Sequence, residues 1–106
     1  MTNRRGTLRE LYIKRTLEKY GWIVVRASLS AGGLTGAETK PIDLVACRKG
    51  TVLFIQVSKR KHDITEKEKK ELARLAGAAG ATPVLCYKEQ GHYTFTDLNG
   101  RPIDIT

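Results

Sequence analysis

The chain has 106 residues, of which 41% are hydrophobic, so it is long enough for one compact domain spanning residues 1–106 and too short for two independent cores. It carries 19 basic against 11 acidic residues, a net charge of +8, which favours a polyanionic partner such as nucleic acid. No apolar run approaches the roughly 20 residues of a membrane span, and the N-terminal segment lacks the apolar core of a signal peptide, so we expect a cytoplasmic protein without membrane contact.

The first predicted element is a helix over residues 7–20. Glu10 falls on the same helical stripe as Ile13 and Leu17, which are expected to face the interior. A carboxylate on such a stripe is unusual. An ion pair between Glu10 and Lys14, four residues further on, is the simpler explanation and the one that spacing alone favours.

Two strands and a loop are predicted next. The β-branched run at residues 22–27 predicts a buried strand, and the glycine-rich segment 28–40 predicts a loop. Residues 41–47 alternate in the manner of a second strand, with Asp43 near its start. From the pattern alone, a polar residue close to a turn at the end of a strand is the simple explanation of Asp43.

A third strand is predicted over residues 51–58, where apolar and polar positions alternate. This alternation places Gln56 and Ser58 on one face of the strand. A basic run, KRK, follows at once.

The second half of the chain begins with the clearest helix, residues 65–80. Thr65 and Glu68 match a capping box, and Gly80 supplies the stop. The remaining predicted strands are residues 82–88, 92–98 and, after an Asn99-Gly100 turn, 101–106. The sum is an α/β fold of order α-β-β-β-α-β-β-β, with helices flanking a mixed sheet.

The cysteines and histidines form no recognisable motif. Cys47 and Cys86 lie in apolar, strand-like runs without a C-x-x-C pair, and we expect both to be buried thiols. His62 and His92 stand alone, and neither is assigned a role.

The segments RRG, EKYGWIVVR and IDLVA, and a strand holding Gln56-Val57-Ser58 before KRK, occur in this order along the chain. This pattern resembles the archaeal Holliday junction resolvases of the restriction-endonuclease-like nuclease superfamily. The similarity continues through ELARLAGAAGATPVLCYK and covers roughly residues 4–88. It implies a restriction-endonuclease-like fold and a homodimer that acts on four-way or branched DNA in recombination and repair.

The resemblance also implies a site. In that family a helix glutamate, a strand aspartate and the glutamate of an E-x-K motif bind divalent metal, the lysine of the motif assists the attacking water, and a loop serine contributes to activity. The matching positions here are Glu10, Asp43 and Gln56 for the metal, and Gln56, Ser58 and Ser30 for catalysis.

Two of these positions depart from the family. Mg²⁺, or Mn²⁺ in its place, prefers converging carboxylate oxygens, whereas Gln56 offers a neutral carbonyl, so metal binding is expected to be weak or absent. Ser58 brings no positive charge, and losing such a group typically costs about 10² to 10³ in rate. Cleavage is therefore expected to be weakened or lost. An active Mg²⁺-dependent junction endodeoxyribonuclease is the alternative hypothesis.

Phosphate contacts are expected from the basic residues around the site, since these would give salt-dependent affinity that is largely independent of base sequence. They are Arg4, Arg5, Arg9, Arg26, Lys59, Arg60 and Lys61. Simpler explanations stay open: a disordered basic tail, an ion pair of Arg26 with an acid at the core edge, and a solvated strand edge. The charge could also serve solubility or heat adaptation. A general RNA-binding or partner-binding module is a further alternative.

Overall fold

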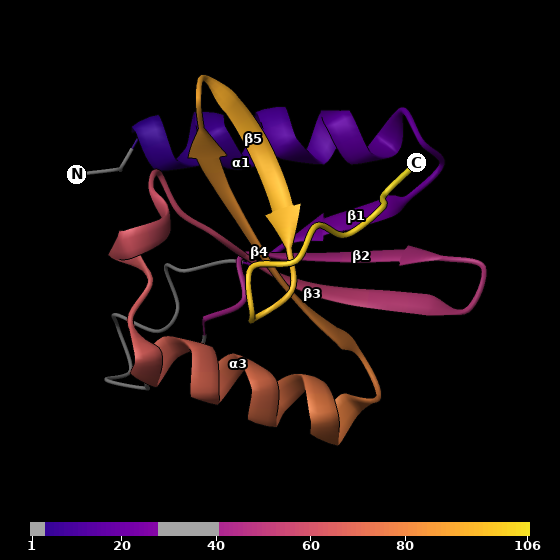
Figure 1. The fold of residues 1–106 in the computed structure, drawn as a ribbon. Coiled ribbons are helices and arrows are strands. Elements are labelled where there is room, and N and C mark those ends of the chain that lie inside the picture. Colours follow the sequence, from indigo (N-terminus) through magenta and orange to yellow (C-terminus); the bar gives the residue numbers. More distant parts are fainter. Residues whose placement is uncertain (1–3, 28–40) are drawn as a thin grey trace.

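The computed structural model describes residues 4–27 and 41–106, with side chains from residue 8 onwards (Figure 1). Its elements are α1 (Arg4–Glu18), β1 (Ile23–Arg26), β2 (Leu44–Arg48), β3 (Thr51–Val57), the 3₁₀ helix η1 (Lys61–Asp63), α3 (Glu66–Ala79), β4 (Thr82–Glu89) and β5 (His92–Thr96). The predicted α/β class is confirmed. None of the helices in the described ranges is long and apolar enough to cross a membrane.

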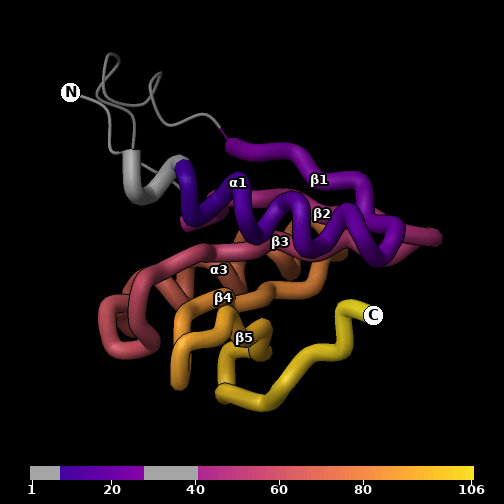
Figure 2. Tube along the Cα trace, turned by 90° about the horizontal axis from the view of Figure 1, so that it is seen from above, coloured from indigo at the N-terminus to yellow at the C-terminus, as the bar shows by residue number. Residues whose placement is uncertain are grey.

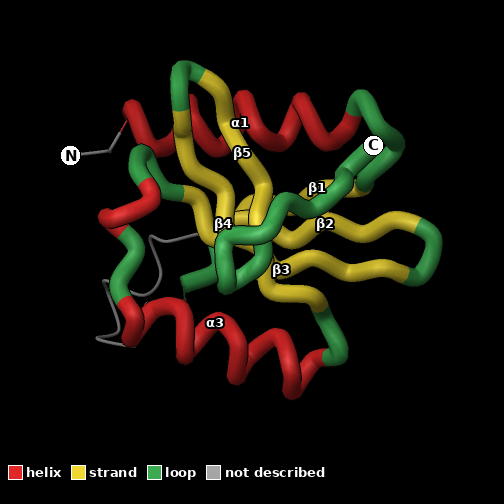
Figure 3. The backbone as a smooth tube through the Cα atoms, viewed as in Figure 1, coloured by secondary structure: helices red, strands yellow, loops and turns green. Residues whose placement is uncertain are grey.

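The strands form one mixed sheet of five in the order β1-β2-β3-β4-β5. β3 pairs with β4 in parallel, and every other neighbouring pair is antiparallel. A parallel pair needs a crossover, and η1 and α3 supply it. The two long helices, α1 and α3, flank the sheet from opposite sides (Figure 3).

Each helix covers its own face of the sheet, because side chains alternate along the strands. Ile13 and Leu17 of α1 belong to the larger core cluster, which includes Val84 and Cys86 of β4. On the other face Leu72 of α3 packs in a smaller cluster. The second cluster consists of Ile64, Leu72, Leu85 and Tyr87, with Ile42, Phe54 and Leu98 at its margin. Figure 2 shows α1 running along one side of the strands.

The ends of α3 follow the sequence prediction. The Glu68 backbone N–H donates to the Thr65 hydroxyl at 3.1 Å, and the Thr65 backbone N–H donates to Glu68 Oε1 at 2.9 Å. Gly80 ends the helix in the left-handed region with φ of 73°, which glycine adopts without steric cost. The predicted capping box and glycine stop are both confirmed.

The predicted last strand, residues 101–106, is wrong. Within this described segment only an isolated bridge joins Pro102 to Thr96. Two backbone hydrogen bonds form this bridge, from Asp97 N–H to Arg101 O and from Ile103 N–H to Phe95 O. The Asp97 carboxylate also accepts from the backbone N–H groups two and four residues further on. Beyond the bridge, Ile105 O accepts from the Trp22 side chain at 2.8 Å, a partner that belongs to no ladder. The chain then crosses the larger cluster as an irregular segment, in which Ile105 is buried.

The expectation for the two cysteines is half confirmed. Cys86 is buried, whereas Cys47 is exposed. Cys47 pairs with Ile23 across the β1–β2 ladder, on the sheet face that α3 covers only over β3 and β4. Ile23 and Val25 are 72% and 61% exposed there. We call the part of this face formed by Ile23, Val25 and Cys47 the open β1–β2 face.

Candidate functional site

Glu10 lies on the inner stripe of α1, where only 8% of the residue is exposed. Its Oε1 accepts from the guanidinium of Arg26, with both Nε and Nη2 at 3.1 Å. The predicted pair with Lys14 is wrong, because Lys14 instead binds Glu18 at 2.7 Å. The alternative in which Arg26 pairs with an acid at the core edge is thus confirmed, and the strand that follows α1 supplies the counter-charge of Glu10.

Asp43 stands one residue before β2, and its backbone is fixed on both sides. Its N–H donates to Ile55 O at 2.8 Å, and its carbonyl accepts from Ala27 N at 2.9 Å. Its side chain is fixed as well, because Oδ2 accepts from the Val57 backbone N–H at 2.7 Å. The carboxylate therefore caps the end of the β2–β3 pairing and stays in the sheet plane, at the point where β3 ends.

Burial raises the pKa of Asp43 from its ordinary value of 3.8 to about 6. The hydrogen bond from Val57 N–H opposes this shift, the negative charges of Glu10 and Glu68 add to it, and Arg9 lowers the pKa slightly. The site thus gathers negative charge that no ion pair of Asp43 within the described residues neutralises. This negative charge would attract a cation.

Gln56 and Ser58, the two altered positions, engage different partners. Gln56 is 7% exposed, and its Nε2 donates to Glu68 Oε2 at 3.0 Å. Its Oε1 is buried and has no hydrogen-bond partner in the part of the chain that the structure describes. Ser58 lies one residue beyond β3, and its hydroxyl donates to the Arg60 carbonyl at 3.0 Å.

Glu68 is the site residue that sequence reasoning missed. Its Oε1 serves the capping box of α3, which explained the residue locally and gave no reason to look further. The second oxygen, Oε2, reaches Gln56 on β3. The capping box was still a usable signal, because it places Glu68 in the first turn of the helix that follows the β3 strand.

Whether these residues fit a metal ion depends on their oxygen donors. The Asp43 carboxylate and the unpaired Gln56 Oε1 are donors that a hard cation such as Mg²⁺ prefers. Glu10 is engaged by Arg26, and the described ranges hold no group of three or more His, Cys, Asp or Glu that could bind a metal. Within the described ranges, the oxygens left to a hard cation are therefore those of Asp43 and the amide oxygen of Gln56.

Three predicted residues cannot be placed. Ser30 lies outside the described residues, within the segment 28–40. Arg4 and Arg5 begin α1, but their side chains lie outside the description as well.

The basic run after β3 is exposed to solvent. Lys59 and Lys61 are exposed, and the Lys61 ammonium lies beside Gly100. Arg60 is exposed too, with its Nε 3.4 Å from Asp63 Oδ2. These cations face solvent near the site, where they suit phosphate contacts.

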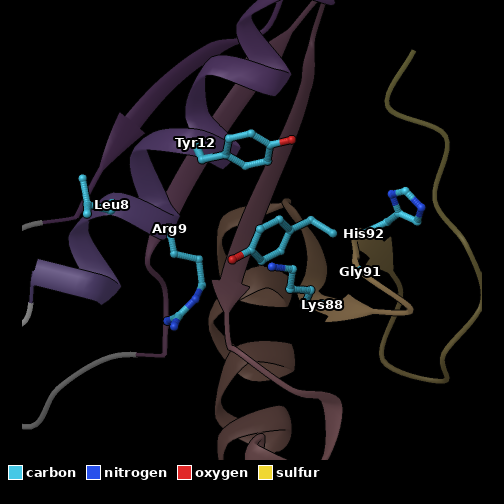
Figure 4. Close-up of a pocket in the computed structure, with 7 residues that line it drawn as sticks. Leu8, Arg9, Tyr12, Lys88, Gly91 and His92 are labelled. Carbon is cyan, nitrogen blue, oxygen red and sulfur yellow. The ribbon is translucent and has the colours of Figure 1, made fainter.

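A pocket between α1 and the β4–β5 hairpin was also missed (Figure 4). Its lining residues are Leu8, Arg9, Tyr12, Lys88, Gly91, His92 and Tyr93. Arg9 was predicted as a phosphate contact, and the structure places it both here and near Asp43. Finding the pocket required the packing of the hairpin beside the helix, for which the sequence carries no local signal.

Known proteins resemble this chain over most of its length. A family model described as archaeal Holliday junction resolvase (hjc) matches residues 1–100. The crossover junction endodeoxyribonuclease Hjc of Methanocaldococcus jannaschii is 34% identical over 95 residues, which cover 87% of this chain and 65% of that protein. The match therefore spans 65% of the length of this curated relative.

A solved structure shares the fold. The Holliday junction resolvase Hjc of Archaeoglobus fulgidus superposes with a TM-score of 0.71 at 24% identity, covering 88% of this chain and 77% of that one. At this identity the likeness concerns the fold alone. The predicted α/β fold, a mixed sheet flanked by helices, is confirmed and shared with this structure.

Proposed function

The chain belongs to the archaeal Holliday junction resolvase family, and from that membership we propose that it binds four-way or branched DNA, with metal-dependent phosphodiester cleavage weakened or lost. The replacement of the E-x-K motif by Gln56-Val57-Ser58 carries this proposal. The amide of Gln56 is bound to Glu68, and the hydroxyl of Ser58 is bound to a backbone carbonyl.

Cleavage of a phosphodiester needs positive charge where negative charge builds up on the phosphate. Ser58 supplies none, and Arg60 and Lys61 point towards Asp63 and Gly100. Among the described residues, Arg9 is the cation that acts on Asp43. A guanidinium does not readily replace an ammonium in proton transfer, because it stays protonated.

Binding does not depend on this missing charge. The net charge of +8 and the exposed Lys59, Arg60 and Lys61 support attraction to phosphates. Contacts of this kind recognise the shape of a branched backbone, with little dependence on base identity. The affinity is therefore expected to fall steeply with salt.

Mg²⁺, or Mn²⁺, would be held by Asp43 and Gln56 Oε1, with Glu10 as a further ligand if Arg26 releases it. When bound, the ion would polarise a phosphoryl oxygen and lower the pKa of a bound water. Asp43 is held in place for this role by Val57 N–H, whatever occupies the site.

The second candidate is an active Mg²⁺-dependent crossover junction endodeoxyribonuclease. Two observations favour it: the buried Gln56 Oε1 has no partner within the described residues, and the pKa of Asp43 is raised to about 6. A bound cation would relieve both. Under this hypothesis Glu10, Asp43 and Gln56 surround the metal and the turnover is slow.

A homodimer forms part of the proposal, because a two-fold symmetric protein suits a two-fold junction. The open β1–β2 face supports it, since Ile23 and Val25 expose apolar surface that a second copy could cover. Sedimentation of the free protein tests this, with Val25→Asp expected to favour the monomer.

The two candidates are separated by incubating the protein with a labelled four-way junction, and with a linear duplex of the same sequence, in Mg²⁺ and in Mn²⁺. We expect tight, junction-selective binding without product. Paired nicks would show that cleavage survives and would support the second candidate. Equal affinity for junction and duplex would contradict both.

The double variant Gln56→Glu with Ser58→Lys sharpens this test, and we expect it to create or raise cleavage by at least about 10². Asp43→Asn added to the double variant is the matched control and should remove the gain. If the double variant stays inactive while it still binds junctions, the site has been placed wrongly. If the gain survives Asp43→Asn, the product comes from another nuclease.

A further inference from the structure

The pocket between α1 and the β4–β5 hairpin combines exposed aromatic surface with positive charge. Leu8 and Tyr12, one helical turn apart on α1, are 64% and 59% exposed. The cavity measures about 530 Å³, within the range of sites that hold small organic ligands. Exposed apolar side chains grouped in a concave site mark a binding surface more often than scattered ones do.

Two tyrosines form the wall of this pocket. The rings of Tyr12 and Tyr93 lie 5.6 Å apart between centroids, with 43° between their planes. The Lys88 ammonium lies 5.6 Å from the Tyr93 ring centroid. Tyr93 is thereby fixed between a ring and a cation, whereas Tyr12 keeps most of its surface free for a planar group.

The charged side chains among the described lining residues of this pocket are positive. Arg9, Lys88 and His92 contribute nitrogen groups, and none of the described residues that line the pocket is acidic. Figure 4 shows Arg9 and Tyr12 projecting from α1 on the side of Lys88. A ligand that carries both a flat ring and a negative charge matches this combination of aromatic surface and cations.

We propose that this pocket binds one unpaired nucleotide of a DNA strand, with its base stacked on Tyr12 and its phosphate between Arg9 and Lys88. This inference rests on the proposed function, because it names what part of a branched DNA the protein holds. Arg9 links the two sites, since it lines the pocket and also acts on Asp43. A nucleotide displaced at a branch point would thus lie beside the carboxylates.

The test uses four DNAs: a fully paired four-way junction, the same junction with one unpaired nucleotide at the branch point, and a linear duplex with and without the same unpaired nucleotide. Affinities are measured by fluorescence anisotropy in EDTA at fixed salt. We expect the unpaired nucleotide to raise the affinity of both DNA forms at least fivefold, about the low end for one base stacked on an aromatic ring. An abasic residue at that position should remove the gain, because it keeps the phosphate and lacks the base.

Tyr12→Ala should abolish the gain and leave the affinity for the fully paired junction within about twofold, whereas Tyr12→Phe should retain it. Tyr20→Ala is the matched control, because Tyr20 lies near the other end of α1, is 44% exposed and does not line the pocket. An equal gain in wild type and Tyr12→Ala overturns the inference, and so does a loss that is the same for every DNA. The wild-type preference for paired junction over paired duplex tests the proposed function separately.

Discussion

The two faces of the sheet differ in what their helices bring to it. α1 contributes Ile13 and Leu17 to the larger cluster, and Glu10, the one buried charge among its described side chains, is paired with Arg26. α3 packs a smaller cluster around Leu72 and, from its first turn, directs Glu68 to Gln56. The first face is apolar, and its buried carboxylate is paired with an arginine. The second face carries a buried amide oxygen, Gln56 Oε1, that has no partner among the described residues. The face under α1 thus contributes most to stability, whereas the face under α3 carries the altered site position.

One leucine on each face tests this division, because Leu17 and Leu72 are both 0% exposed. Leu17→Ala should lower the free energy of unfolding by about 3 to 4 kcal/mol, and Leu72→Ala by about 2 kcal/mol, since the smaller cluster collapses more easily around a cavity. Urea titration followed by circular dichroism measures both. If Leu72→Ala costs as much as Leu17→Ala or more, the two faces form one energetic core and the division fails.

The second prediction concerns Asp43, whose carboxylate lies at the end of the β2–β3 pairing, and the effect of its ionisation on stability. Its pKa is about 6 in the folded chain and 3.8 ordinarily, so the folded protein binds the proton more tightly than the unfolded one. The cost of ionising Asp43 is absent below pH 4, grows between pH 4 and 6, and is complete above pH 6. It amounts to about 2 to 3 kcal/mol.

Asp43→Asn should therefore be more stable than wild type at pH 7 by about 2 kcal/mol and equal to it near pH 4, provided the amide oxygen still accepts from Val57 N–H. Unfolding free energies from pH 4 to 8 in EDTA measure the difference between the two proteins. A constant difference across this range would show that Asp43 does not carry the pH dependence. Adding Mg²⁺ at pH 7 should stabilise wild type and leave Asp43→Asn unchanged.

The elements with local signals were predictable from the sequence. The capping box and Gly80 fixed the ends of α3, and alternation identified β2 and β3. The β-branched run identified β1, but the prediction that this strand is buried is wrong, because three of its four residues are exposed at the edge of the sheet. The stripe on α1 placed Glu10 inside, as the structure confirms. The last strand failed because pairing after the Asp97 turn stops at one bridge, and the Ile105 carbonyl accepts from the Trp22 side chain instead of from a neighbouring strand.

Contacts between distant segments were not predictable in the same way. Spacing within α1 favoured Lys14 as the partner of Glu10, whereas the folded chain brings Arg26 from the next strand. The capping role of Glu68 hid its bond to Gln56, because a local function already explained the residue. Site positions 10, 43, 56 and 58 came from resemblance, and only the sheet pairing and the packing of the helices set their partners.

The two ion pairs of α1 give the smallest effect and the cleanest contrast. Glu10 and Arg26 meet at the edge of the larger cluster with side-chain exposures of 11% and 35%, whereas Lys14 and Glu18 face solvent with 30% and 41%. Double-mutant cycles with Glu10→Gln and Arg26→Met should give a coupling of about 1 to 2 kcal/mol, because Glu10 loses its only described counter-charge in a partly desolvated place. The cycle with Lys14→Met and Glu18→Gln should give about 0.3 to 0.5 kcal/mol and vanish in high salt. Equal couplings would mean that burial does not strengthen the Glu10 pair, and that Arg26 is free to leave it for a phosphate at little cost.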